Sequence, residues 1–273
     1  MKMLKRILGL VAVIADIILS ITGCSIDVVG VDLDGSGHHA GNVEVSAPIS
    51  YSLDFNGQVA LRVTGANGTV RVQGAPGARR VVVSGVRRVR SDSRRDAEAH
   101  LAHLQVSAKA GPVEFQIKTL QPSQTQGRTY IVDYDISIPA HLGVTVNNGN
   151  GTVRLEGIES DVKVTNGNGE IVLEDVSGSS WVSLGNGDIS AWTRLPLGGQ
   201  IVHSVGNGSL FLSVQEEVSG QFGAKVGNGT IKVSGLDMQD VVSTPHQLNG
   251  VLGSGQGLIE LSAGNGEIRV QGG

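Results

Sequence analysis

The sequence predicts an all-β fold, a single-stranded β-solenoid with one short helix near its amino-terminal end. Three observations predict it. The tripeptide Gly-Asn-Gly, or a close variant, returns seven times; each copy is followed by alternating apolar and polar residues; and later copies are separated by 18, 18, 21 and 21 residues. A repeat with a nearly fixed period indicates stacked structural units. Glycine accounts for 40 of 273 residues and aromatic residues for only 3%, so we expect many turns and an aliphatic core.

The tripeptides predict corners between strands. Glycine and asparagine tolerate backbone with positive φ at low cost, and such backbone is what a tight corner needs. When repeats stack, one asparagine lies above another, and the side-chain amides can form a hydrogen-bonded ladder. The predicted ladder consists of Asn67, Asn150, Asn168, Asn186, Asn207, Asn228 and Asn265. A glycan or ordered ions bound along this ridge are the alternative reading of the same residues.

Strands are predicted on both sides of each corner. The third and fifth residues after each asparagine are apolar: Val70/Val72, Val153/Leu155, Ile171/Leu173, Ile189/Ala191, Leu210/Leu212, Ile231/Val233 and Ile268/Val270. Positions four and six before the asparagine are also mostly apolar, as in Val164 and Val162. This period of two is typical of half-buried strands. The 37 residues between Asn228 and Asn265 are close to two periods, so we expect a degenerate turn of the solenoid around Leu248-Asn249-Gly250.

The amino-terminal part of the domain is less regular. Tyr51, Leu53 and Phe55 alternate, a second apolar run spans 81–86, and further strands are expected at 113–118 and 129–138. Between them, Ser93 and Asp96 have capping-box spacing, which predicts one short helix near 92–104. We expect this helix to cover one end or one side of the stack. The predicted domain therefore covers 49–271, with a helix-bearing part at 49–140 and regular repeats at 141–271.

The first residues resemble a bacterial lipoprotein signal peptide. A positive start, Lys2, Lys5 and Arg6, precedes a short apolar run that ends at Ile21-Thr22-Gly23-Cys24. We expect a signal peptide at 1–23, lipidation of Cys24 by acyl chains such as palmitate, and a flexible tether at 24–48. A free or buried cysteine behind an ordinary signal is the alternative. Ser25 favours the outer membrane if the organism has one. The tether carries a fragment like a calcium loop, 32–37, but Val43 stands where the loop needs glutamate.

One further stretch precedes the regular repeats: Tyr134-Asp135-Ile136-Ser137-Ile138-Pro139-Ala140 leads into 144–151. Together with the later Gly-Asn-Gly corners and 66–70, this stretch resembles a bacterial family described as putative adhesins. The resemblance covers about 49–271. It implies a right-handed β-solenoid and brings no catalytic residues.

The net charge and the cysteine count argue against several classes of partner and site. A formal net charge of −4 argues against a nucleic-acid partner, and a single cysteine excludes an internal disulfide framework or a cysteine-ligated zinc site. Neither a cofactor nor a metal is predicted. Possible binding residues are the basic cluster Arg87, Arg88 and Arg90, suited to anionic lipid or acidic polysaccharide, and the two tryptophans Trp181 and Trp192, which could stack on sugars. The alternative for the arginines is a solvated entrance to the helix, because acidic residues interleave with them, and the alternative for the tryptophans is packing at the edge of the solenoid.

Three further groups have both a chemical and a structural reading. Asp133 and Asp135 lie on one face of a strand and could act as a glycosidase pair, or form a solvated face. His203 is predicted to point inward, either as a core residue or as a functional one. His100 and His103 share a helical face but have no evident third metal ligand.

These observations predict a non-enzymatic, lipid-anchored protein of the bacterial cell envelope that binds or scaffolds in the manner of an adhesin. The expected partners are the membrane, through the lipid, and an envelope protein or surface glycan. A polysaccharide-cleaving enzyme and an envelope-stress sensor are the alternatives, and the oligomeric state is left open.

Overall fold

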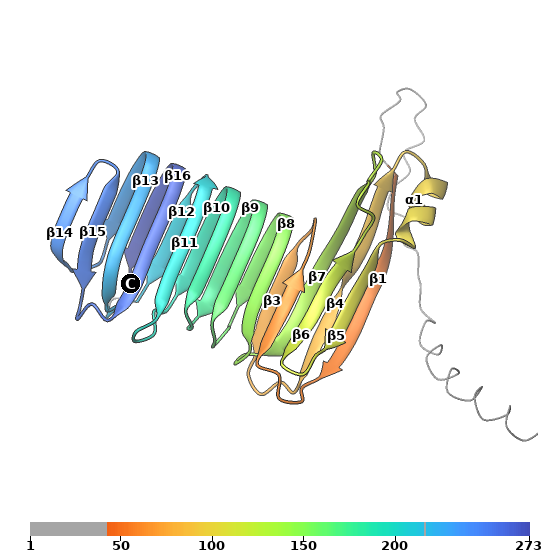
Figure 1. The fold of residues 1–273 in the computed structure, drawn as a ribbon, viewed down its shortest axis with the longest axis horizontal. Helices are drawn as coiled ribbons and strands as arrows, with labels where there is room; N and C mark the ends of the chain where they lie inside the picture. The colour runs from red at the N-terminus through yellow and green to blue at the C-terminus, as the bar shows by residue number, and fades with distance from the viewer. Residues whose placement is uncertain (1–42, 216) are drawn as a thin grey trace, which may run out of the picture.

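The computed structural model describes residues 43–215 and 217–273. They form an all-β structure in which sixteen strands belong to one sheet, with a single helix at one end (Figure 1). The predicted signal peptide, Cys24 and the fragment 32–37 lie outside the described residues. The domain begins earlier than the predicted boundary at 48, because Val45, Ala47 and Ile49 alternate into the core from a strand that starts at Val43.

The amino-terminal part combines antiparallel strands with the helix. The strand β1 pairs antiparallel with β4, and β4 pairs antiparallel with β7. The helix α1 packs against β1 and β4, and its N-cap Ser93 accepts a hydrogen bond from the Asp96 amide. The sequence placed this helix correctly but extended it at both ends. The elements are β1 (Val43–Asp54), β2 (Ala60–Thr64), β3 (Val70–Ala75), β4 (Arg80–Ser91), α1 (Arg94–Leu101), β5 (Gln105–Ala110), β6 (Glu114–Leu120) and β7 (Thr129–Pro139).

The carboxy-terminal part is a stack of parallel strands in register. Each rung of the stack has a first arm before its corner and a second arm after it. The elements are β8 (Gly143–Glu156), β9 (Val162–Val176), β10 (Ser180–Thr193), β11 (Gln200–Asn207), β12 (Leu210–Val214), β13 (Gly220–Ser234), β14 (Met238–Thr244), β15 (Gln247–Leu252) and β16 (Gly257–Gly272). Equivalent residues pair across neighbours, for example Asn150 with Asn168 and Asn168 with Asn186.

Aliphatic columns fill the inside of the stack. In the second arm Val153, Ile171, Ile189 and Leu210 pair in sequence and are each 0–1% exposed. Columns of the first arm include Val146, Val164 and Val182. Full burial of such a side chain contributes about 1.5–3 kcal/mol, so the columns hold successive rungs together. The predicted inward positions after the corners are therefore buried, except for Ile231 and Val233 in β13, which are only partly buried.

The last rungs do not follow the order of the chain. The predicted degenerate turn around 248–250 is wrong: β14 and β15 form an antiparallel hairpin, and β15 pairs antiparallel with the first arm of β13. The final strand β16 then returns and lies between β11/β12 and β13, parallel to both (Figure 1). The hairpin segment 238–252 lacks the Gly-Asn-Gly corner that is present in β8, β9, β10, β13 and β16 and at the junction of β11 and β12.

Six of the seven corners have a glycine on each side of the asparagine, and the two glycines serve different purposes; at the first corner Ala66 precedes Asn67. The glycine after each asparagine has positive φ, from +122° at Gly68 to +144° at Gly229. The glycine before it does not, but a Cβ on Gly167 would lie 2.4 Å from the carbonyl oxygen of Gly149 in the adjacent rung. The asparagines themselves keep negative φ, so the expectation that they share the left-handed backbone is wrong. Their side chains, rather than their backbone, explain why asparagine occupies the corner.

Candidate functional site

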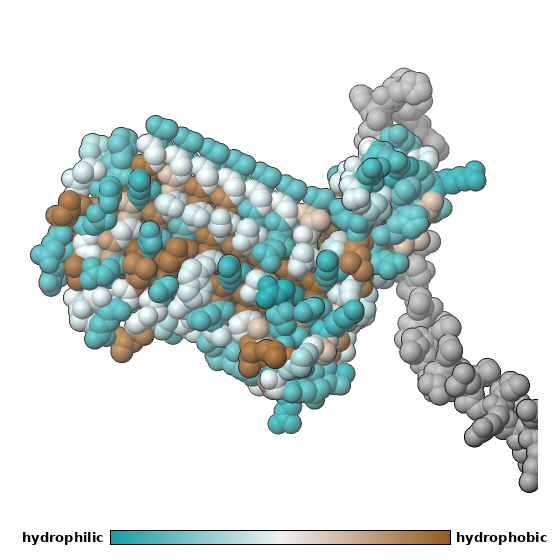
Figure 2. All heavy atoms as spheres, viewed as in Figure 1, coloured by the Kyte–Doolittle hydropathy of each residue, from teal (hydrophilic) through white to brown (hydrophobic). Residues whose placement is uncertain are grey.

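The seven predicted ladder asparagines form one continuous row. Six amide-to-amide hydrogen bonds of 2.6–2.8 Å join them in the spatial order Asn67, Asn150, Asn168, Asn186, Asn207, Asn265, Asn228. Every bond has the same direction, because each amide nitrogen donates to the amide oxygen of the rung nearer the amino-terminal part. At that end the row stops where Asn67 Nδ2 donates to the Tyr130 carbonyl oxygen. Figure 2 shows a straight row of hydrophilic residues along one edge of the molecule, as such a ridge requires.

A second, buried amide pair lies inside the first corners and was not predicted. Asn148 donates to the side-chain oxygen of Asn166 and to two carbonyl oxygens, and Asn166 donates to the carbonyls of Gly151 and Asn168. Later rungs place Leu184 or Val205 at this position. The only signal in the sequence is an asparagine two residues before a ladder asparagine.

The predicted basic cluster is paired within the protein. Arg88 forms ion pairs with Glu44 and Asp133, and Arg90 binds Glu44 at 2.6 Å. Arg87 donates to the carbonyl oxygens of Leu101 and Leu104 and so satisfies acceptors at the end of α1. To bind an anionic headgroup, these guanidinium groups would have to exchange partners that they already have. Their placement favours a structural role.

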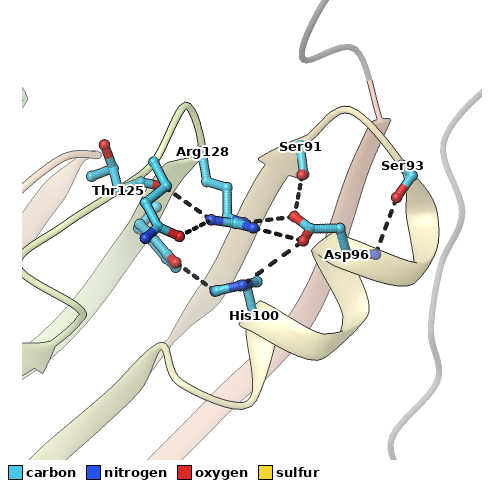
Figure 3. A network of polar contacts seen from close by, with 8 residues as sticks. Ser91, Ser93, Asp96, His100, Thr125 and Arg128 are labelled. Carbon is cyan, nitrogen blue, oxygen red and sulfur yellow. Dashed lines mark hydrogen bonds and ion pairs between the residues drawn. The ribbon is translucent and has the colours of Figure 1, made fainter.

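A polar network fixes α1 to the loop before β7 (Figure 3). Both Asp96 carboxylate oxygens accept from Arg128, at 2.6 and 2.7 Å, and the Ser91 hydroxyl also donates to Asp96. These hydrogen bonds hold the pKa of the Asp96 carboxyl well below its usual range. His100 Nδ1 lies 2.8 Å from the Tyr130 hydroxyl, and its Nε2 lies 3.8 Å from Asp96. His103 contacts His100 ring to ring, so this pair of histidines belongs to the helix anchor.

The paired aspartates of β7 are also held by neighbours. Asp133 accepts a hydrogen bond from the Thr69 amide at 2.8 Å in addition to the ion pair with Arg88. Asp135 faces Arg71 at 3.9 Å. Within residues 43–215 and 217–273, no group of three His, Cys, Asp or Glu side chains is arranged to hold a metal ion.

His203 lies inside the stack, as its register predicted. The side chain is 1% exposed, and its Nε2 lies 2.8 Å from the hydroxyl of Ser180, which is also buried. In the adjoining rungs Val182 and Leu261 occupy the same column. Burial lowers the pKa of His203 to about 3, because an apolar environment disfavours the charged ring. His203 is therefore a neutral core residue.

The two tryptophans lie on different arms of β10. Trp181 is half-buried on the first arm, whereas Trp192 is 44% exposed on the second and packs against Phe211 with ring centroids 5.4 Å apart. Trp192 lines a groove of about 280 Å³ together with Asp175, Thr193, Arg194, Ser213 and Gln215, and we name it the Trp192 groove. The two rings do not form one platform. Of the predicted binding residues, only Trp192 lines this groove.

No family model and no curated protein matches the chain. Among solved structures, the chain is similar to a putative cell adhesion protein from Clostridium sporogenes ATCC 15579, at 13% identity over 83% of this chain and 100% of that one, with a TM-score of 0.49. A putative adhesin from Bacteroides fragilis NCTC 9343 shows 10% identity over 82% and 96% of the chains and a TM-score of 0.27. A putative adhesin from Parabacteroides merdae ATCC 43184 shows 9% identity over 82% and 95%, with a TM-score of 0.27. At these identities and scores the likeness carries no conclusion about function.

Proposed function

We propose that this protein is a lipid-anchored, non-enzymatic module of the bacterial cell envelope that binds or scaffolds in the manner of an adhesin. The observation that carries the proposal is the unbroken amide ladder over in-register aliphatic columns, from Asn67 to Asn228. It supports reading the stack as a single-stranded solenoid with a rigid exposed surface.

Rigidity matters for binding because a surface that is already ordered loses little conformational entropy when a partner docks. Neighbouring rungs lie about 4.8 Å apart, so outward side chains repeat at a fixed interval along the stack. Stacked repeats commonly provide such extended binding faces. The visible face in Figure 2 mixes hydrophobic and weakly polar residues below the hydrophilic ridge, which suits a partner larger than a small metabolite.

The proposed attachment to a membrane rests on the amino-terminal sequence. Cys24 follows a positive start and a short apolar run, and acyl chains on this cysteine would hold the protein at a membrane. Within the described residues, no helix is long and apolar enough to cross a bilayer. Because of the amino-terminal sequence pattern, we propose Cys24 as the anchor, with the outer membrane as its location if the organism has one.

The charged residues support binding over catalysis. A glycosidase needs two carboxyl groups beside a sugar, one of which acts as an acid. Asp133 and Asp135 are each paired with an arginine, and Asp133 also accepts from a backbone amide. Both aspartates therefore already have partners within the protein, which supports a structural role for the pair.

Two measurements test the proposal. Mass spectrometry of the amino-terminal peptide should find acyl groups on Cys24, and Cys24→Ala should move the protein from the membrane to the soluble fraction. Cross-linking on intact cells should enrich an envelope protein or surface glycan with the wild type and lose it with Cys24→Ala. Turnover of an anionic polysaccharide by the purified protein would overturn the non-enzymatic assignment, and an unacylated Cys24 would overturn the anchor.

A further inference from the structure

Two residues that line the Trp192 groove have a buried side-chain oxygen with no hydrogen-bond partner among the described residues, Thr193 and Gln215. Thr193 pairs with the buried Val176 and Val214, so its side chain points into the stack and away from the Trp192 ring. Gln215 follows the end of β12, next to the groove. An unsatisfied buried polar atom costs about 1–3 kcal/mol, so the Gln215 oxygen beside the groove requires an explanation such as water or a ligand.

The other walls have complementary chemistry. The exposed Trp192 ring, supported by Phe211, offers an apolar surface. Arg194 and Asp175 form a loose ion pair of 3.6 Å at the rim, with side chains 69% and 70% exposed. Because exposed pairs of this kind contribute little to stability, both groups can exchange their contact for a ligand hydroxyl. An aromatic wall with a few converging hydrogen-bonding groups is a common form of ligand site.

We infer that the Trp192 groove binds one ring of a neutral saccharide. The carbon-bound hydrogens of a pyranose would lie on Trp192, and its hydroxyl groups would bond to Gln215, Asp175 and Arg194. A volume of about 280 Å³ is below the roughly 300 Å³ at which drug-sized sites begin, so the groove takes one sugar unit of a longer chain. Charges of both signs at the rim favour a neutral sugar over an acidic one. The inference deepens the proposed function by naming a ligand class and a place on the surface.

The test uses the full chain in detergent with three probes: maltotetraose, an N-acetylglucosamine tetramer and polygalacturonate. Ligand-detected magnetic resonance and tryptophan fluorescence should show saturable binding of at least one neutral probe and weaker binding of polygalacturonate. Trp192→Ala should weaken that binding about tenfold, which corresponds to about 1.4 kcal/mol, and Trp192→Phe should restore most of it. Trp181→Ala is the matched control, since Trp181 does not line the groove, and it should bind normally.

If Trp192→Ala unfolds, as circular dichroism would reveal, Asp175→Ala and Arg194→Ala replace it, because both side chains are exposed at the rim. These variants should weaken binding severalfold without loss of structure. No saturable binding of either neutral probe, or equal binding by wild type and Trp192→Ala, would overturn the inference. The proposed function would survive that result if cross-linking on cells still enriched a partner. Acidic-probe binding that depends on Arg194 alone would also overturn it.

Discussion

The corner asparagines stabilise the stack through their side chains, one amide at a time. Each internal member donates one hydrogen bond and accepts another; Asn168 donates to Asn150 and accepts from Asn186. We predict that Asn168→Ala lowers the free energy of unfolding by about 1–2 kcal/mol, because two hydrogen bonds are lost. Denaturant titration measures the effect. Thr165→Ala, an exposed change in the same strand, should have little effect, and equal losses in both variants would contradict the ladder's role.

His203 should make stability depend on acidity. Its folded pKa of about 3 lies below the unfolded value of about 6.5, so the unfolded chain binds more protons between these values. Stability is then complete above about pH 6.5 and is lost as the pH falls toward 3. From about pH 7.5 to about pH 5 the loss should be about 2 kcal/mol.

The double variant Ser180→Ala/His203→Leu tests whether His203 causes this pH dependence. It also removes the Ser180 hydroxyl, which would otherwise lose its hydrogen-bond partner. Leucine matches Leu261 in the same column. The double variant should lose the pH dependence in this window, measured as the difference between two denaturant titrations. An unchanged slope would show that another group causes the acid sensitivity.

At this scale the sequence predicts residues that repeat and misses those that do not. The ladder asparagines and the inward position of His203 follow from register alone. The pairing of Arg88 with Glu44 and Asp133 could not be predicted, since β1, β4 and β7 are brought together only by the antiparallel sheet. For the same reason the sequence could not identify Glu44 and Asp133 as the acidic partners of the basic cluster.

At the scale of the element, the corner depends on glycines that no other residue can replace. Gly187 has φ of +125°, and a Cβ there would lie 1.8 Å from the carbonyl oxygen of Gly169. We predict that Gly187→Ala costs about 3 kcal/mol or more, since both strain and a backbone clash oppose it. Gly198→Ala is the control: its φ is +71° but nothing lies within 4 Å of the added carbon. It should cost only about 1 kcal/mol. Similar costs by thermal or denaturant unfolding would argue against the clash.

We expect the Asp96 carboxylate, rather than the overall charge of the helix, to hold α1 against the neighbouring strands. Asp96 joins Arg128 and Ser91, whereas Glu98 pairs only with Arg94 on the exposed face. We predict that Asp96→Asn speeds hydrogen exchange at Ala97 and Leu101, because the neutral amide cannot accept both Arg128 hydrogen bonds as strongly. Glu98→Gln should leave these amides unchanged. Equal exchange in the two variants would show that α1 is held by packing alone.

For the whole molecule, the class of fold and most strands could be predicted, but their spatial order could not. A repeat shows which segments can stack because each rung buries its apolar columns on a neighbour. It does not show which neighbour, since the columns of β13 and β16 fit the same surface: Ile231 pairs with Ile268 as Ile268 pairs with Leu210. The hairpin β14–β15 decides the order by pairing with β13 and leaving the surface of β11 and β12 to β16.

The spatial order of the last strands limits the sequence in which they can fold. Among the described strands, β13 pairs only with β15 and β16, so it cannot join the stack until β16 has paired with β11 and β12. We predict that in refolding followed by pulsed hydrogen exchange, amides of β8, β9 and β10 become protected first, and those of β13 and β16 later and together. Leu261→Ala, in the centre of β16 and 1% exposed, should delay protection of β13 while leaving β9 unaffected. Val164→Ala, a similar truncation within β9, is the control and should slow the early phase. Protection of β13 ahead of β16 would mean that rungs first stack in chain order and rearrange afterwards.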